Sequence, residues 1–425
     1  MKITRVFFLF CIIFLSCSFH TYAQDTLQSQ IDAAPEYGIV KIPSGNYDEA
    51  IVLSKPITLE GTGEVIVRSC RKEPVITVKG QSVTLKHIKV EQCSSRANTE
   101  AIHVTGKNHR LKNLQIYTKQ FGIKLNRASD TVVEGSLIKG NSKGNGIDLW
   151  ESNNNMIQGV EIDKVRDGIY IENSHFNRIT RNAIGNSRYG IHIMFSNQIT
   201  VQNNKSHNNI TGAMVMGTKE TKIERNELTF NNRNVNAQGL LLYDAENTET
   251  IGNRISNNRV GMYVENANNN QISDNEVTEN FIGMQFKNAN ENHVSDNVFV
   301  GNVNESQAIN SNENEIIHNY WDASLKLDTK GNGMSSIPHR ADPFFLTLTN
   351  EVPEYQLFFQ APGMIVLQTL LKSPESRVLT DYEPMMTTRG KKEENNFSFK
   401  MQIGMIIVSM LAISITLFKI GRKRR

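Results

Sequence analysis

The chain has 425 residues, of which 21% are charged, and a formal net charge of +3. The positive charge sits at the ends, because two basic residues lie in the first five and five lie in the last seven. Without those seven residues the body carries −4, so binding to nucleic acid has no electrostatic support.

Residues 1–23 have the pattern of a secretory signal. A basic start precedes the apolar stretch Val6–Phe19, and Thr21 and Ala23 place small residues before a cleavage site. An uncleaved anchor and lipidation at Cys17 are the alternatives. We therefore expect the body of the protein to lie outside the cytoplasm.

Residues 24–320 are predicted to form one solenoid with a cap at its N-terminal end. The cap includes a short helix from Thr26 to Ala34, whose apolar residues share one face. Short β-branched segments separated by Gly, Pro and Asn follow, as in the strands of an all-β fold.

Cys70 and Cys93 are 23 residues apart, which is close to the length of one coil of that solenoid. Stacking would place them on neighbouring coils, roughly 4.8 Å apart by strand spacing. We expect a disulfide, as is common in exported proteins, and a thiolate metal pair is the alternative.

A pattern of Gly followed by alternating apolar and variable residues repeats along the chain. The steps between these glycines are 24, 22, 22, 22, 27, 22 and 22 residues, and the positions are Gly122, Gly146, Gly168, Gly190, Gly212, Gly239, Gly261 and Gly283. A constant period in strand-like segments predicts a parallel β-helix. We interpret the glycines as tight backbone bends.

An asparagine recurs with matching steps at Asn182, Asn204, Asn226, Asn253, Asn275, Asn297 and Asn319. Asparagine tolerates left-handed backbone at sharp corners, and stacked amides can also hydrogen-bond between coils. These asparagines are therefore predicted to be structural.

Strand alternation sorts the residues after each glycine into two faces. The first and third are apolar throughout, as in Ile169 and Ile171, and are predicted to form the core. The second and fourth point outward, and those predicted to form a contact surface are Asp148, Trp150, Tyr170, Glu172, Tyr243, Tyr263 and Glu265. At the two central coils the outward residues become His192, Met194, Met214 and Met216.

The repeat ends near Trp321, and residues 321–386 are predicted to be either a C-terminal cap or a docking region with a short apolar helical stretch. Residues 387–400 form a polar linker. Residues 401–420 are apolar and long enough to cross a membrane once, and the basic tail 421–425 should stay in the cytoplasm. We therefore expect a single-pass protein of the cell membrane with its β-helix on the extracytoplasmic side.

The coils resemble the NosD family of nitrous oxide reductase maturation proteins. The resemblance lies in Gly168–Ser174, Arg188–Ser196, the longer coil that leads into Ala237–Leu242, and the ending Asn319–Trp321 with Ile337-Pro338. It implies a right-handed parallel β-helix that helps to assemble the copper–sulfur centre of nitrous oxide reductase, with no enzymatic activity of its own. The implied partners are the membrane and nucleotide-binding subunits of an ABC transporter, the reductase and a copper chaperone.

Copper contact is expected at His192, Met194, Met214 and Met216, which stack in two columns on neighbouring coils. Imidazole and thioether groups suit Cu(I), which would be bound transiently. The alternative is that the methionines form an adaptable surface for a protein partner.

Two other functions remain open from the sequence. A polysaccharide lyase, hydrolase or epimerase would use Asp148 and Glu172 beside the aromatic residues of the same face. A surface adhesion solenoid is the third possibility.

Overall fold

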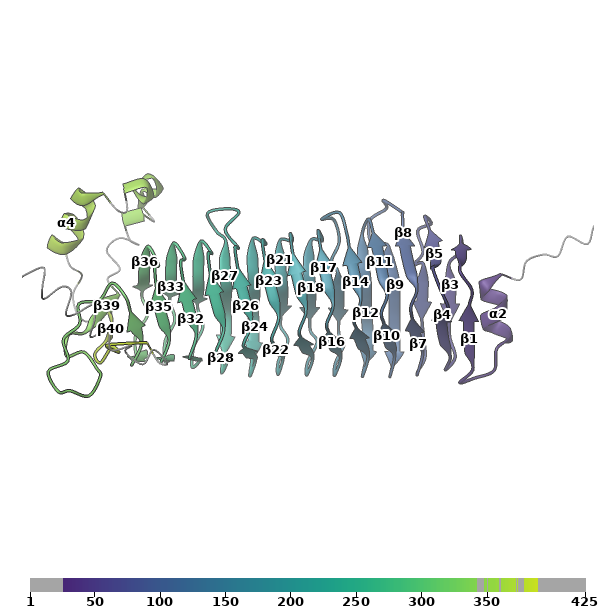
Figure 1. The fold of residues 1–425 in the computed structure, drawn as a ribbon, viewed down its shortest axis with the longest axis horizontal. Helices are drawn as coiled ribbons and strands as arrows, with labels where there is room; N and C mark the ends of the chain where they lie inside the picture. The colour runs from purple at the N-terminus through teal and green to yellow at the C-terminus, as the bar shows by residue number, and fades with distance from the viewer. Residues whose placement is uncertain are drawn as a thin grey trace, which may run out of the picture.

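The computed structural model describes residues 26–341, 348–349, 351–358, 361–371, 373 and 378–388. Over these residues the strands stack into one elongated, right-handed parallel β-helix (Figure 1). Three sheets of 13, 13 and 12 strands run along it, and we call them A, B and C. One strand from each sheet makes a coil.

Sheet A consists of β1 (Ile39–Ile42), β4 (Thr58–Gly61), β7 (Thr84–Lys86), β10 (Arg110–Lys112), β13 (Val132–Glu134), β16 (Met156–Gln158), β19 (Arg178–Thr180), β22 (Thr200–Gln202), β25 (Lys222–Glu224), β28 (Glu249–Ile251), β31 (Gln271–Ser273), β34 (His293–Ser295) and β37 (Glu315–Ile317). Sheet B consists of β2 (Gly45–Tyr47), β5 (Val65–Ser69), β8 (Lys89–Gln92), β11 (Gln115–Thr118), β14 (Leu137–Lys139), β17 (Glu161–Asp163), β20 (Ala183–Gly185), β23 (Lys205–His207), β26 (Glu227–Thr229), β29 (Arg254–Ser256), β32 (Glu276–Thr278), β35 (Val298–Val300) and β38 (Tyr320–Trp321).

Sheet C carries the glycine repeat. It consists of β3 (Ile51–Leu53), β6 (Ile76–Val78), β9 (Glu100–Lys107), β12 (Phe121–Ser129), β15 (Ile147–Trp150), β18 (Asp167–Glu172), β21 (Tyr189–Met194), β24 (Thr211–Lys219), β27 (Gln238–Glu246), β30 (Val260–Glu265), β33 (Ile282–Lys287) and β36 (Asn304–Ile309).

The core is a stack of aliphatic side chains inside the three sheets. The first and third residues after each glycine are fully buried, as Ile169, Ile171, Ile191 and Ile193 illustrate. The predicted inward face of sheet C is therefore confirmed. The coils begin at β1 and β2, which already pair with β4 and β5.

The glycines do not serve as tight bends, contrary to the prediction. Gly190 and the seven other repeat glycines have no left-handed backbone and lie in or beside strands of sheet C. A Cβ on Gly190 would lie 2.5 Å from the carbonyl oxygen of Gly212 and 1.9 Å from Oγ of Ser206. The glycines are needed because the next coil approaches too closely for any side chain.

The repeating asparagines form a continuous hydrogen-bonded ladder at the corner between sheets A and B. From Asn182 onward, each backbone N–H and each amide nitrogen donates to Oδ1 of the next asparagine, at 2.9–3.0 Å. The left-handed residue is the one before the asparagine, such as Arg181 with φ 56°. The prediction of stacked amides is thus confirmed, and the left-handed assignment was wrong by one residue.

The N-terminal end is covered by α2 (Leu27–Ala33), which Thr26 caps with its side chain. Cys70 and Cys93 form a disulfide with a Cα–Cα distance of 4.5 Å, so the expected pairing is present rather than two free thiolates.

At the other end, β39 (His339–Ala341) pairs with β40 (Leu379–Asp381) in a small antiparallel sheet. Asp381 Oδ2 accepts hydrogen bonds from the backbone N–H of Asn319 at 2.9 Å and from Nε1 of Trp321 at 3.0 Å. This segment therefore caps the last coil and ends the asparagine ladder.

A 3-10 helix η1 (Pro353–Phe358) and α4 (Pro362–Leu370) lie beyond the last coils (Figure 1). Several of their apolar side chains are exposed, Leu357 and Leu370 most of all. Within the described residues no helix is long and apolar enough to cross a membrane. The predicted signal at 1–23 and the predicted span at 401–420 lie outside those residues.

Candidate functional site

The outer face of sheet C brings the sequence-predicted residues together in two columns. The register of β15, β18, β21, β24, β27 and β30 gives one column of Asp148, Tyr170, His192, Met214, Leu241 and Tyr263. The second column contains Trp150, Glu172, Met194, Met216, Tyr243 and Glu265. His192 thus lies directly beside Met214, and Met194 beside Met216, on neighbouring strands.

These side chains are less accessible than an outer face suggests. His192 is only 5% exposed, Met214 9% and Asp148 6%, whereas Trp150 is 37% exposed. All four His and Met residues lie in the outward columns that strand alternation predicts, but His192 and Met214 are nearly buried there. The ring of His192 is covered edge-on by two aromatic rings, Tyr170 and Tyr189, at centroid distances of 5.0 and 4.6 Å.

His192 is held by a buried carboxylate from the preceding coil. Nδ1 of His192 lies 3.1 Å from Oδ2 of Asp167, a residue that is 1% exposed. Arg188 makes a bidentate contact with the same carboxylate through one edge of its guanidinium. Nε donates to Oδ1 at 2.8 Å, and Nη2 donates to Oδ2 at 2.6 Å. The guanidinium also lies over the ring of Tyr189, 4.4 Å from its centroid.

Asp167 is ionised in this setting. Burial alone would raise its pKa, but the hydrogen bonds from His192 and Arg188, together with the Arg188 charge, outweigh burial and leave the pKa below its ordinary value. An ionised carboxylate can only accept hydrogen bonds. Nδ1 of His192 therefore carries a proton and donates a hydrogen bond to Asp167.

The other ring nitrogen of His192, Nε2, is buried and has no hydrogen-bond partner in the described part of the chain. Buried polar atoms are nearly always hydrogen-bonded, so an unpartnered one calls for a specific explanation. A neutral imidazole with its proton on Nδ1 has its lone pair on Nε2. That is the form in which histidine binds a metal.

The second column is partly engaged already. The hydroxyl of Tyr170 donates to Oε2 of Glu172 at 2.5 Å and lies 3.5 Å from the sulfur of Met194. Burial, followed by the Glu172 contact, raises the pKa of Tyr170, which stays protonated. The free soft donors are therefore Met214 and Met216 rather than Met194.

The remaining predicted surface residues do not converge on the histidine. Asp148 accepts a hydrogen bond from Nδ2 of Asn145 at 2.9 Å, and burial raises its pKa. Glu265 pairs with Lys287 at 2.8 Å, and burial, followed by the Glu265 charge, raises the pKa of Tyr263. These residues lie along the same face, several coils apart.

Among the described residues, no group of three or more His, Cys, Asp or Glu could hold a metal ion. What the central coils do offer is one imidazole nitrogen beside thioether sulfurs, a set that suits a soft monovalent ion.

Sequence reasoning missed Asp167, Arg188 and Tyr189. It considered only residues after each glycine, whereas Asp167 and Tyr189 come immediately before one and Arg188 two residues before. Asp167 and Arg188 are 21 residues apart, which is close to one coil. This spacing of an acid and a base before successive glycines could have indicated that they pair.

A longer coil borders this region. The connection between β26 and β27 carries the five extra residues and projects from the β-helix (Figure 1). Nη2 of Arg233 in this loop donates to Oδ1 of Asn186, two coils back, at 2.7 Å. The loop therefore contacts the corner between sheets B and C where Arg188 also lies.

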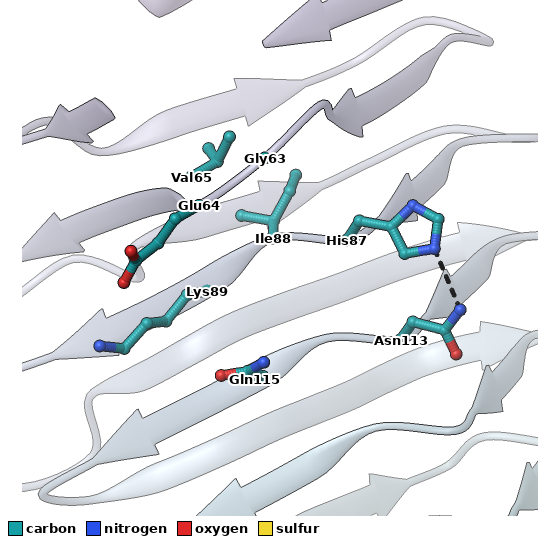
Figure 2. A pocket seen from close by; sticks show the side chains of 8 residues that line it. All are labelled: Gly63, Glu64, Val65, His87, Ile88, Lys89, Asn113 and Gln115. Atoms are coloured by element: carbon teal, nitrogen blue, oxygen red, sulfur yellow. Dashed lines mark hydrogen bonds between the residues drawn. The ribbon is translucent and has the colours of Figure 1, made fainter. Parts of the chain in front are cut away.

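A separate hollow of about 450 Å³ lies near the N-terminal end and is lined by Gly63, Glu64, Val65, His87, Ile88, Lys89, Asn113 and Gln115. Figure 2 shows Glu64, Lys89 and Gln115 on successive coils, with the His87–Asn113 hydrogen bond of 3.1 Å to one side. Its polar groups do not converge on one point, and none of the sequence-predicted site residues lines it.

The sequence from 142 to 335 matches the family described as periplasmic copper-binding protein (NosD). This range contains every residue of the two columns and the Asp167–Arg188–His192 cluster. This match and the parallel β-helix together fit a NosD-type protein. The disulfide and α2 lie outside the part that matches NosD.

Several solved structures are similar to this chain in fold. The A-module of mannuronan C-5 epimerase AlgE4 from Azotobacter vinelandii has a TM-score of 0.50 and 12% identity, covering 68% of this chain and 94% of its own. DFA-IIIase from Arthrobacter chlorophenolicus A6 gives 0.49 and 12%, covering 61% and 83%. Identities this low show the fold alone. No curated protein sequence matches the chain.

Proposed function

We propose that this protein binds copper outside the cytoplasm and serves as a non-enzymatic accessory factor in assembly of the copper–sulfur centre of nitrous oxide reductase. The observation that carries the proposal is Nε2 of His192, which is buried and has no partner among the described residues, with Met214 beside it in the same column. Copper is cargo in this proposal, taken up as Cu(I) and passed on. An ABC transporter, the reductase and a copper chaperone are the proposed partners.

The donor set supports transient rather than permanent binding. One imidazole and two or three thioethers are neutral, soft ligands, and Cu(I) prefers such ligands over carboxylates. Met214 is nearly buried beside His192. Because methionine is flexible, its side chain can move to admit an ion while the strand stays folded. A site without charged ligands also releases its ion readily to a thiolate-containing acceptor.

The test is anaerobic Cu(I) titration of the full-length protein in detergent, against a chromophoric Cu(I) chelator. Replacing His192, Met194, Met214 and Met216 together by Ser should abolish binding, and so should the variant with three Leu and Phe at 192, which keeps the apolar area. Met156→Leu on the outer face of sheet A is the matched control and should bind as the parent does. Unchanged affinity in the Ser variant would refute the site.

Cells carrying the two variants distinguish copper handling from docking. If copper contact is the role, both variants should leave nitrous oxide reductase without its copper–sulfur centre. If the methionines instead dock a partner, the Leu/Phe variant should keep much of the activity. Affinity purification from detergent-solubilised membranes should recover both transporter subunits.

A second candidate is binding of an acidic polysaccharide along sheet C. The observation in its favour is the exposed Trp150 next to Glu172 and near Asp148, whose burial raises its pKa toward that of a general acid. Only two tryptophans are present, and Trp321 is buried. Tryptophan fluorescence that shifts on addition of uronate oligosaccharides, without any Cu(I) binding, would favour this candidate.

A further inference from the structure

We infer that Asp167 and Arg188 are positioning residues that fix His192 in the tautomer with a bare Nε2, so that the site presents a ligand before any metal arrives. The inference rests on the proposed function and adds two residues to it. Neither of them contacts the ion. They act through the ring of His192.

The hydrogen bonds of Asp167 select one of the two neutral tautomers of the histidine. Three N–H groups converge on its two oxygens, two from Arg188 and one from Nδ1 of His192. Asp167 is fully buried, so water cannot replace any of them. A ring turned over would place Cδ2 against the carboxylate, and a ring protonated on Nε2 alone would place a lone pair there. Either change loses the bond.

Arg188 has a second effect on the site. Its bidentate contact occupies the outer lone pairs of Asp167, which therefore cannot itself act as a metal ligand. The guanidinium is held in place by stacking over Tyr189. The site consequently offers only neutral donors, which disfavours hard divalent ions relative to Cu(I).

The covered ring explains why such support is needed. His192 packs against Tyr170 and Tyr189 and sits between Tyr170 and Met214 in its column. Carboxylate support of a ligating histidine contributes about 10- to 100-fold to metal affinity in other proteins. Removing it here should weaken Cu(I) binding by a factor in that range and leave the strand register intact.

The direct test is ¹⁵N-histidine NMR of the metal-free, full-length parent protein. The signals of His192, assigned by their loss in His192→Phe, should show a protonated Nδ1 and an unprotonated Nε2 near neutral pH. A spectrum with the proton on Nε2 would overturn the inference. This test uses the parent protein, so it does not depend on whether a variant of Asp167 folds.

The second test is Asp167→Asn. An amide offers one acceptor to three donors and turns its own N–H₂ toward at least one of them, so it cannot hold both Arg188 and the Nδ1 proton. Cu(I) affinity should fall by about 10- to 100-fold, with the histidine tautomers now mixed. Asp163→Asn, four residues earlier and paired with Asn186, is the matched control and should behave as the parent does.

The outcomes separate this inference from the proposed function. If His192→Phe does not change Cu(I) affinity, the copper site itself is wrong. If His192→Phe abolishes binding while folded Asp167→Asn binds as tightly as the parent, the site stands and the positioning role is refuted. Loss in both variants, with tautomer mixing in Asp167→Asn, supports both.

Discussion

The corner between sheets A and B and the central coils of sheet C both bury polar side chains, but in opposite ways. At the corner, each repeating asparagine accepts hydrogen bonds from the coil before it and donates to the coil after it. Asn226, for example, accepts from Asn204 and donates to Asn253. On sheet C, His192 is satisfied at one nitrogen and left open at the other. The ladder asparagines are satisfied by their own copies, whereas His192 depends on neighbours outside the repeat.

This contrast gives a rule for interpreting the solenoid. Polar residues that pair with their own copies at the coil period, as the ladder asparagines do, are structural. Buried polar residues that break the period are candidates for function. The variants below test whether the two classes differ in stability as the contrast requires.

The largest expected effect is Asn226→Leu in the middle of the ladder. The change removes the acceptor of two N–H groups of Asn204 and leaves Val201 O and Asn253 Oδ1 without the amide donor. Each buried group left unpaired costs about 1–3 kcal/mol, so the free energy of unfolding should fall by more than about 3 kcal/mol. Denaturant unfolding followed by circular dichroism measures this.

Two controls accompany that variant. Asn236→Leu, in the exposed loop, should change stability by less than about 0.5 kcal/mol. His192→Phe, which removes a single hydrogen bond from a site with an open nitrogen, should cost far less than Asn226→Leu. Equal losses for His192→Phe and Asn226→Leu would mean that both are structural.

A glycine pair sharpens the difference between close approach and backbone strain. In Gly190→Ala the new Cβ meets the carbonyl oxygen of Gly212 at 2.5 Å, and the cost should be about 2–3 kcal/mol, as for an overpacked core. In Gly159→Ala the nearest atom is 3.9 Å away, and only the φ of +60° is unfavourable. That variant should lose about 1 kcal/mol. Thermal melting that ranks Gly159→Ala as the worse of the two would contradict our interpretation of the repeat glycines.

The C-terminal cap tests what happens where the repeat ends. His339 stacks on Trp321 at a centroid distance of 4.1 Å, hydrogen-bonds Ser306 and Ser324, and lies 3.5 Å from Glu305. Burial, with a smaller effect of Asp322, raises the pKa of Glu305 to about 8. Burial, with a smaller effect of Lys326, lowers the pKa of His339 to about 3.

These two shifts predict opposite pH dependences. Folded Glu305 keeps its proton up to about pH 8, whereas unfolded Glu305 releases it above its ordinary pKa of 4.5. The free energy of unfolding therefore falls as pH rises from 4.5 to about 8. Unfolding lets His339 take up a proton below 6.5, so its contribution is lost as pH falls from 6.5 to about 3. The two slopes cancel between 4.5 and 6.5, where the cap should be most stable.

From pH 6.5 to 8 the cap should lose roughly 2 kcal/mol, at about 1.4 kcal/mol per pH unit. Limited proteolysis between β39 and β40 as a function of pH measures this. Glu305→Gln should remove the loss on the alkaline side only, and His339→Phe the loss on the acidic side only. A flat profile in the parent protein would show that these two groups titrate normally.

The sequence predicts the fold well because the solenoid is built from local, repeated signals. The spacing of Gly190 and Gly212, and the apolar residues after each glycine, fix the register of sheet C, and the structure has that register. The spacing of the two cysteines likewise matches their disulfide. Such signals recur with every coil, so an error at one position is corrected by the others.

The site is predicted less completely because its contacts cross between coils at positions that do not repeat. Strand alternation places His192 on the outer face, but it cannot show that Tyr170 and Tyr189 cover the ring. It also cannot pair Asp167 with Arg188, since that contact depends on how two side chains turn at a corner. Alternation gives the direction of a side chain, and burial depends on its neighbours.

The constant rise per coil also makes the β-helix a ruler. Five strand steps separate β21, which carries His192, from β36, the last strand of sheet C and a contact of the cap. At strand spacing this sets the site roughly 24 Å from that end of the rod. Adding or removing one whole coil between them would move the site by roughly 4.8 Å along the axis and leave its own contacts unchanged. The number of coils, rather than any side chain, therefore fixes how far from its C-terminal end the protein presents His192 to whatever approaches it.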